Sequence, residues 1–254
     1  MIKKLFLTLI FSLFIITPVL GAGIDVNTTL MLHLDGADGA TSTIDSSFYN
    51  NTIGFNGTAQ LDTAVKKWGT ASLLLDGNSD YLDIDDNVAL DIFGSSADDW
   101  TFDFWVKHTD HVGAETYFEQ YEDASNRWTF FHAHGQGLEF RFYSEGGYII
   151  DSPVGGEIAD TNWHHIALIK VADEYGIYKD GTQVVYVQDD STDTLAGSLF
   201  VGARGNISEY FYGSMDEIRI QHSNYFGAAP NATPDDTITV PTEAYNARRI
   251  ILIQ

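Results

Sequence analysis

Short stretches of alternating apolar and polar residues follow one another along most of the chain. Residues 100–107 are the clearest case, because Trp100, Phe102, Phe104 and Val106 fall on one face of an extended segment. Residues 138–143 alternate in the same way. A period of two is typical of a β-strand that buries one face. No stretch keeps a helical period, so the pattern predicts an all-β protein.

Turn signals separate these stretches at regular intervals, and a short helix fits only within residues 85–93. We expect strands at residues 28–34, 53–61, 71–75, 81–84, 100–107, 116–121, 127–134, 138–143, 163–171, 175–179, 182–187, 198–203 and 210–220. Many short antiparallel strands with regular turns are typical of a sandwich or barrel.

Two turns carry the strongest local signals. Residues 76–80 read D-G-N-S-D between two apolar runs, which predicts a hairpin of strands 71–75 and 81–84. Asp180-Gly181 predicts a second hairpin, because both residue types tolerate the positive φ that a two-residue turn needs.

Composition divides the chain into three parts. Residues 1–22 combine Lys3 and Lys4 with an apolar run and a small-residue end, which predicts a cleaved secretory signal peptide. Residues 23–222 hold the strand-like segments and form one domain. Residues 223–254 are rich in Pro, Thr and Asn and end in an apolar run, so we interpret them as an irregular, poorly ordered tail.

Charge and cysteine content exclude several classes of protein. The chain has 13 basic and 36 acidic residues and a net charge of −23, which argues against nucleic-acid partners and anionic membranes. It is compatible with cations and with neutral glycans. Cysteine is absent. Disulfides, thiol catalysis and cysteine-bound zinc are therefore excluded.

The order of the segments resembles the concanavalin A-like lectin/glucanase superfamily, specifically its laminin G-like or pentraxin-like jelly rolls. The matching segments are Leu30–Gly36, Ile44–Ser47, Trp68–Leu82, Trp100–Lys107, Asn162–Leu168, Tyr178–Thr182 and Met215–Ile220. The resemblance implies a two-sheet antiparallel β-sandwich (jelly roll) with a concave groove. It implies no single activity.

The resemblance also implies a candidate metal site. Some members of the superfamily hold a structural Ca²⁺ at positions that correspond to Asp35 and Asp216. Hard oxygen ligands suit calcium. The alternative is that Asp35 belongs to a local turn and that Asp216 accepts a buried hydrogen bond.

A glycan-binding surface is the second candidate site. If the Phe-rich strand faces form the core, the opposite faces carry aromatic and polar residues that could bind a sugar. These are Trp105, Tyr117, Glu119, Tyr121, Arg141 and Tyr143. The alternative is that they reflect only the composition of exposed strands, and that Trp105 belongs to the core.

The remaining candidate sites have weaker support in the sequence. His132 and His134 would share one face of a strand as a possible metal pair, but the spacing shows no third ligand. His164 and His165 lie in a segment where a structural role is expected. The E-x-D-x-x-E pattern of laminarinase-type relatives is not found, so we expect a protein that is not an enzyme.

We therefore expect a secreted, non-catalytic binding or adhesion module at or outside the cell surface. Its partner would be a glycan or a surface protein, with possible structural Ca²⁺ and no membrane contact after signal cleavage. An alternative is a structural or assembly component of a cell surface or virion that joins a partner through its tail. A divergent glycoside hydrolase is a third hypothesis.

Overall fold

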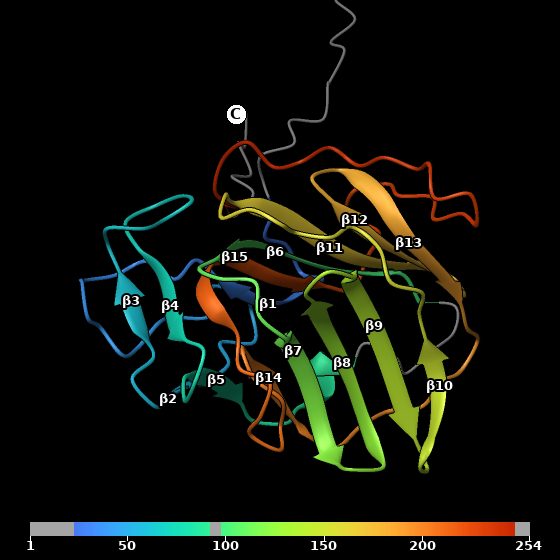
Figure 1. Ribbon diagram of the computed structural model, residues 1–254, viewed down its shortest axis with the longest axis horizontal. Helices are drawn as coiled ribbons and strands as arrows, with labels where there is room; N and C mark the ends of the chain where they lie inside the picture. Colours follow the sequence, from blue (N-terminus) through green and yellow to red (C-terminus); the bar gives the residue numbers. More distant parts are fainter. Residues whose placement is uncertain (1–22, 92–97, 247–254) are drawn as a thin grey trace, which may run out of the picture.

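The structure is a computed structural model that describes residues 23–91 and 98–246. Within these residues the chain forms fifteen strands and one short 3-10 helix, η1 (Val88–Leu90). The strands build two antiparallel sheets that stack face to face (Figure 1), which confirms the predicted β-sandwich jelly roll. None of the described residues belongs to a helix long and apolar enough to cross a membrane. The predicted signal peptide lies outside the described residues.

The eight-stranded sheet has its long strands at the centre. Its order is β13 (Thr182–Gln188), β12 (Glu174–Lys179), β11 (His164–Val171), β6 (Trp100–His108), β15 (Tyr212–Gln221), β4 (Ser72–Asp76) and β3 (Gln60–Asp62), with β1 (Thr28–Leu32) also paired to β15. The predicted turn at Asp180-Gly181 is confirmed, since β12 pairs with β13 and both turn residues have positive φ, 50° and 85°.

The seven-stranded sheet faces it across the core. Its order is β10 (Gly147–Asp151), β9 (Gly137–Ser144), β8 (Asn126–Ala133), β7 (Ala114–Asp123), β14 (Ser198–Val201), β5 (Tyr81–Ile84) and β2 (Ile53–Asn56). The sequence analysis did not predict β10.

The hairpin predicted for residues 71–84 is wrong. β4 and β5 lie in different sheets, so residues 77–80 cross from one sheet to the other. Asp76 Oδ1 accepts hydrogen bonds from the backbone N–H groups of Asn78, Ser79 and Asp80, and this holds the crossing turn without strand pairing.

The strand predicted for residues 53–61 is wrong for a related reason. It divides into β2 and β3, which also lie in different sheets. Gly57, with φ of 68°, makes the break, and a Cβ there would lie 2.4 Å from the Ser79 carbonyl oxygen. The buried Asp80 carboxylate accepts from Thr58 N–H and Asp76 N–H, so it joins the two crossings.

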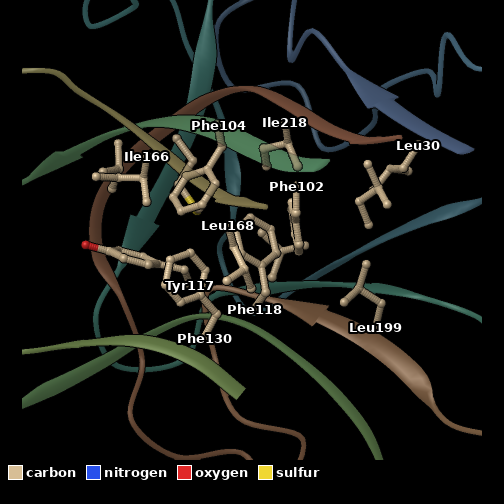
Figure 2. Packing of buried hydrophobic residues seen from close by; sticks show 14 of the residues in the cluster. Leu30, Phe102, Phe104, Tyr117, Phe118, Phe130, Ile166, Leu168, Leu199 and Ile218 are labelled. Atoms are coloured by element: carbon tan, nitrogen blue, oxygen red, sulfur yellow. The ribbon is translucent and has the colours of Figure 1, made fainter. Parts of the chain in front are cut away.

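Aromatic side chains fill the space between the sheets. Figure 2 shows Phe102 and Phe104 of β6 meeting Phe118 of β7 and Phe130 of β8. The ring centroid of Phe118 lies 4.2 Å from that of Phe102 and 4.8 Å from that of Phe104. Each such ring stabilises the fold by roughly 1.5–3 kcal/mol through burial alone. The alternating pattern of residues 100–107 in the sequence therefore marks the core face of β6 correctly.

The segment after β15 covers the outer face of the eight-stranded sheet. In Figure 1 the red segment runs along β11, β12 and β13. Gln183 N–H donates to the Asp236 carbonyl at 2.9 Å, and Ile238 N–H donates to the Gly181 carbonyl at 2.8 Å. The interpretation of residues 223–254 as poorly ordered is therefore corrected for residues 223–246. Residues 248–253, the apolar end, lie outside the described part.

A buried ion pair lies beneath this segment. Arg219 Nε and Nη2 lie 2.9 Å and 2.8 Å from Asp103 Oδ1. Tyr245 donates its hydroxyl to Asp103 Oδ2 at 2.5 Å, and His165 Nε2 lies 3.1 Å from the same oxygen. Burial alone would raise the pKa of Asp103, but Arg219, His165 and Tyr245 outweigh burial and hold it below its ordinary value. The tail thus completes a polar network on the central strands.

His164 and His165 both have structural contacts, as the sequence analysis expected. His165 is buried on Asp103. His164 Nδ1 lies 2.6 Å from Asp180 Oδ2, and Nε2 lies 3.2 Å from Asp160 Oδ1. The hydrogen bond to Asp180 raises the pKa of His164, and the pair ties β11 to the β12–β13 turn.

Replacing Tyr245 by Phe should destabilise the domain by about 1–2 kcal/mol, because a buried carboxylate loses a hydrogen-bond donor. The free energy of unfolding is measured by urea denaturation. Tyr225→Phe is the matched control, since the Tyr225 ring lies 3.7 Å from the Arg219 guanidinium and should keep this contact without its hydroxyl. Equal stability of Tyr245→Phe and wild type would show that the tail does not support the ion pair.

The His164–Asp180 pair should stabilise the fold in a defined pH range. The pKa of His164 is raised and that of Asp180 is lowered, so the contribution is fully present below the ordinary histidine pKa of 6.5 while Asp180 stays ionised. It is lost as the pH rises through the raised pKa. His164→Gln should cost about 0.5–1 kcal/mol near pH 5.5 and less at pH 8.5. The same substitution in an Asp180→Asn background should show a smaller pH dependence, because only the contact with Asp160 then remains.

Candidate functional site

Arginines and aromatic rings gather on the outer face of the seven-stranded sheet. Alternate residues of β8 and β9 point away from the core there, and neighbouring segments complete a hollow of about 100 Å³. We call this surface the arginine–tyrosine hollow. Its lining residues are Ala114, Arg127, Thr129, Phe131, Arg141, Tyr143, Tyr148, Arg204 and Glu209.

Strand register places the guanidinium groups over aromatic rings. Arg127 of β8 pairs with Tyr143 of β9, and its Cζ lies 4.7 Å from the tyrosine ring centroid. Arg141 Cζ lies 5.1 Å from the centroid of Phe131 and 5.8 Å from that of Tyr148. Cation–π contacts of this kind hold the planar groups flat on the sheet.

Carboxylates hold the arginines of the hollow in place through ion pairs. Arg141 Nε lies 2.6 Å from Glu139 Oε1 and 3.0 Å from Asp151 Oδ1. Arg204 Nη1 lies 2.8 Å from Glu209 Oε1. Each guanidinium has five N–H donors, so donors remain for a ligand.

Glu119 lies buried beneath the hollow. Its Oε1 accepts from the Thr129 hydroxyl at 2.7 Å and lies 3.6 Å from Arg127 Nε and 3.5 Å from Arg204 Nε. Gly205 N–H donates to Oε2. Glu119 therefore positions two arginines and a loop and is not free to contact a ligand.

A second, shallower hollow adjoins the first. Glu119, Tyr121, Ala124, Arg127, Arg204 and Asn206 line it. Because Arg127 and Arg204 line both hollows, the two form one extended surface. Guanidinium groups, tyrosine rings and hydroxyls are suited to hydrogen-bond a sugar and to stack on its apolar face.

The structure brings together four of the six residues that the sequence analysis chose for this surface. Glu119, Tyr121, Arg141 and Tyr143 all line one of the two hollows. Arg127 was not predicted from the sequence, although the alternation of β8 could have revealed it. Tyr148 of the unpredicted strand β10 was also missed, and so was Arg204, whose loop has no local pattern that points to the hollow.

Tyr117 does not reach the surface, which corrects the expected strand face. The pairing of β7 with β8 shifts register between Thr116 and Phe118, and this bulge reverses the alternation of side chains. Tyr117 is therefore fully buried in the core (Figure 2).

Trp105 belongs to the other sheet. It faces outward from β6, but it is 5% exposed because the segment before β4 covers it. Lys67 Nζ lies 3.7 Å from a Trp105 ring centroid, and the rings of Trp68 and Trp105 meet edge to face at 6.3 Å. Trp105 therefore fills an interior site, the alternative that the sequence left open.

Asp35 and Asp216 both hold the segment 67–70. Asp216 Oδ2 accepts from Lys67 N–H at 2.7 Å and from Trp68 N–H at 3.0 Å, while Asp35 Oδ1 accepts from Thr70 N–H. Burial raises the pKa of Asp216 to about 7, against the effect of these hydrogen bonds. Each carboxylate oxygen has two lone pairs, so the contacts leave capacity for a cation.

His132 and His134 do not form an isolated pair. His132 is fully buried, whereas the His134 side chain is 44% exposed. His132 instead meets His108 of β6 and Glu115 of β7, and one ligand atom from each of the three lies within 4.8 Å of the others. Sequence spacing along β8 gave no sign of these partners, because they come from other strands.

Comparison with known proteins agrees with the fold. The family model of the concanavalin A-like lectin/glucanases superfamily matches residues 76–224, and the chain belongs to this superfamily. A search of curated proteins gave no match.

Solved structures share the same fold at low sequence identity. Domain 4 of an extracellular arabinanase from Geobacillus stearothermophilus, solved with arabinotriose, has a TM-score of 0.58 and 20% identity over 78% of this chain and 93% of that one. The binding domain of Paraclostridial Mosquitocidal Protein 1 has a TM-score of 0.60 and 17% identity, covering 78% of this chain and 49% of that one. The botulinum neurotoxin serotype D binding domain has a TM-score of 0.59 and 16% identity, covering 79% and 49%. This chain spans about half the length of the two toxin binding domains.

Proposed function

We propose that this protein is a non-catalytic binding module that holds a glycan in the arginine–tyrosine hollow. The observation that carries the proposal is the open surface of arginines and aromatic rings on the outer face of the seven-stranded sheet. The described arginines are Arg127, Arg141, Arg204 and Arg219, and the first three line this surface. Two structures of the same fold give indirect support, the arabinanase domain solved with arabinotriose and a structure of botulinum neurotoxin type C, whose cell entry depends on interaction with two ganglioside molecules.

The charge of the surface favours a neutral glycan. Three guanidinium groups lie among the carboxylates of Glu119, Glu139, Asp151 and Glu209, so their positive charge is balanced locally. The net charge of −23 would further repel an anionic sugar. A neutral sugar would instead be bound by hydrogen bonds from the guanidinium N–H groups to its hydroxyls and by stacking on the Tyr148 ring.

An exported protein would meet such glycans outside the cell. Export still rests on residues 1–22 and stays a prediction. A surface-protein ligand and a structural or assembly role are the alternatives. The second is less favoured because residues 223–246 pack on the domain itself and are not free to join a partner. A glycosidase would require hydrolysis of the bound glycan, which the binding experiments can detect as new reducing ends.

Tyr148→Ala should weaken glycan binding about threefold to tenfold, since one aromatic contact is worth about 0.5–1.5 kcal/mol. Tyr148 is 55% exposed, so its loss should leave the fold intact. Calorimetric titration with neutral arabino-, xylo- and gluco-oligosaccharides measures the change, with sialylated and uronic oligosaccharides as comparison.

Tyr49→Ala is the matched control, because Tyr49 is 50% exposed and lies outside both hollows. Its affinity should equal that of wild type. If Tyr148→Ala binds every oligosaccharide as wild type does, the hollow is not the glycan site. Binding of anionic sugars alone would contradict the charge argument.

We also propose, from the resemblance and the shared contacts with residues 67–70, that Asp35 and Asp216 bind a structural Ca²⁺. Calcium should then raise the melting temperature of the full chain, and a chelator should reverse the rise. Asp35→Asn should remove the effect, whereas Asp38→Asn in the same loop should keep it. A melting temperature that does not respond to calcium in the wild type would reject this site.

A further inference from the structure

A cluster of histidines and glutamates lies at one end of the sandwich, between the two sheets. Four of the eight histidines of the chain meet here. His108 ends β6, Glu115 lies near the start of β7, and His132 lies near the end of β8. All three side chains are buried, with residue exposures of 1%, 3% and 0%. In residues 23–91 and 98–246, no other three side chains of His, Asp or Glu bring their ligand atoms so close together.

Several buried polar atoms around this cluster lack hydrogen-bond partners among the described residues. They are His132 Nδ1, both ring nitrogens of His111, and Glu157 Oε2. The His111 ring stacks on that of His108, with centroids 5.4 Å apart. A buried polar atom without a partner is unfavourable, and several such atoms at one place are typical of a site that binds a ligand.

The distances suit a metal ion. His108 Nδ1 lies 2.8 Å from Glu115 Oε2. Two ligand atoms each about 2.0–2.2 Å from one tetrahedral zinc ion lie about 3.4 Å apart. An ion can therefore replace the proton that these two atoms share after a side-chain movement of less than about 1 Å. The ligand atom of His132 lies within 4.8 Å of both and needs a further small movement.

We propose that His108, Glu115 and His132 bind a divalent transition-metal ion of the zinc class, with His111 as the fourth ligand. Imidazole nitrogens with one carboxylate are donors that zinc prefers, whereas calcium and magnesium prefer oxygen donors. Glu115 and Glu157 supply the two negative charges that balance a divalent ion in a buried site.

The surrounding groups orient the proposed ligands. The Tyr117 hydroxyl lies 2.7 Å from His108 Nε2, and Tyr212 N–H donates to Glu115 Oε1 at 2.8 Å. Glu157 Oε2 lies 3.3 Å from His132 Nε2. Metal-binding histidines commonly donate their second N–H to a carboxylate or another oxygen in this way.

His132 must change tautomer when it binds the ion. Ile158 N–H donates to His132 Nε2 at 3.2 Å, which assigns the ring proton to Nδ1, and no described residue offers Nδ1 an acceptor. Coordination through Nδ1 moves this proton to Nε2, where Glu157 Oε2 accepts it.

The ion would join the two sheets. His108 belongs to the eight-stranded sheet, and Glu115 and His132 belong to the seven-stranded sheet. Because the ligands are buried and come from both sheets, the role we assign to the ion is structural. It would link the two sheets in place of a disulfide, which a chain without cysteine cannot form.

The test uses the full chain, freed of metal by a chelator, and Zn²⁺ alone as the added probe. One equivalent should bind, measured by calorimetry and elemental analysis, and the melting temperature should rise. His111→Ala should weaken binding at least tenfold while the fold persists, because His111 is only partly buried. His132→Gln should reduce binding to background, and His164→Gln, outside the cluster, should bind as wild type does.

Nuclear magnetic resonance of the histidine nitrogens supplies a second measurement in wild type, where no variant can misfold. On zinc addition the proton of His132 should move from Nδ1 to Nε2. The proposal is overturned if zinc leaves the melting temperature and the His132 tautomer unchanged. It is also overturned if both cluster variants, shown to be folded, bind zinc as tightly as wild type, which would indicate adventitious surface binding.

Discussion

The buried ion pair between Asp103 and Arg219 determines which surfaces of this domain are open. The two residues pair directly across β6 and β15, and a register shift between Asp216 and Arg219 sets that pairing. A buried ion pair is stable only when hydrogen bonds satisfy its remaining atoms. Tyr245 and the Gly23 carbonyl provide them, and so both chain segments must pack on the outer face of the eight-stranded sheet. The opposite outer face, on the seven-stranded sheet, holds the arginine–tyrosine hollow.

One irregularity in β7 connects the proposed glycan site with the proposed zinc site. The bulge at Tyr117 turns this residue into the core, where its hydroxyl contacts His108. The same bulge sets the alternation of the following residues, so that Glu119 and Tyr121 face the hollows. In a strand without the bulge, the Tyr117 side chain would point to the outer face. The residues before it would also exchange faces, because a shift of one residue turns each side chain to the other side of the sheet. The first part of β7 therefore contributes side chains to the buried histidine cluster. The later part contributes side chains to the hollows on the outer face.

The sequence alone predicted most strands and the sandwich, because each strand carries its own alternating pattern. It could not predict that β4 and β5 pair with other strands, since a turn looks alike whether it joins partners or crosses between sheets. Of the six residues chosen for the binding surface, four line the two hollows, and one of these, Glu119, is buried beneath them. Trp105 and Tyr117 were misplaced because a covering loop and a bulge decide their environment. The partners of His132 were missed because His108 and Glu115 meet it only in three dimensions.

The acidic composition also has a different meaning once the contacts are known. Asp45 accepts backbone N–H groups from Met31, Ser47 and Asn51, much as Asp76 holds its turn. These carboxylates stabilise loops in place of backbone partners, so a large negative charge does not by itself indicate a calcium surface. A metal site is indicated by the opposite situation, in which buried atoms that could bind a metal have no hydrogen-bond partner. That condition holds at His111 and His132, and this is why a nitrogen-rich cluster gives the stronger structural case for a metal ion in this strongly acidic protein.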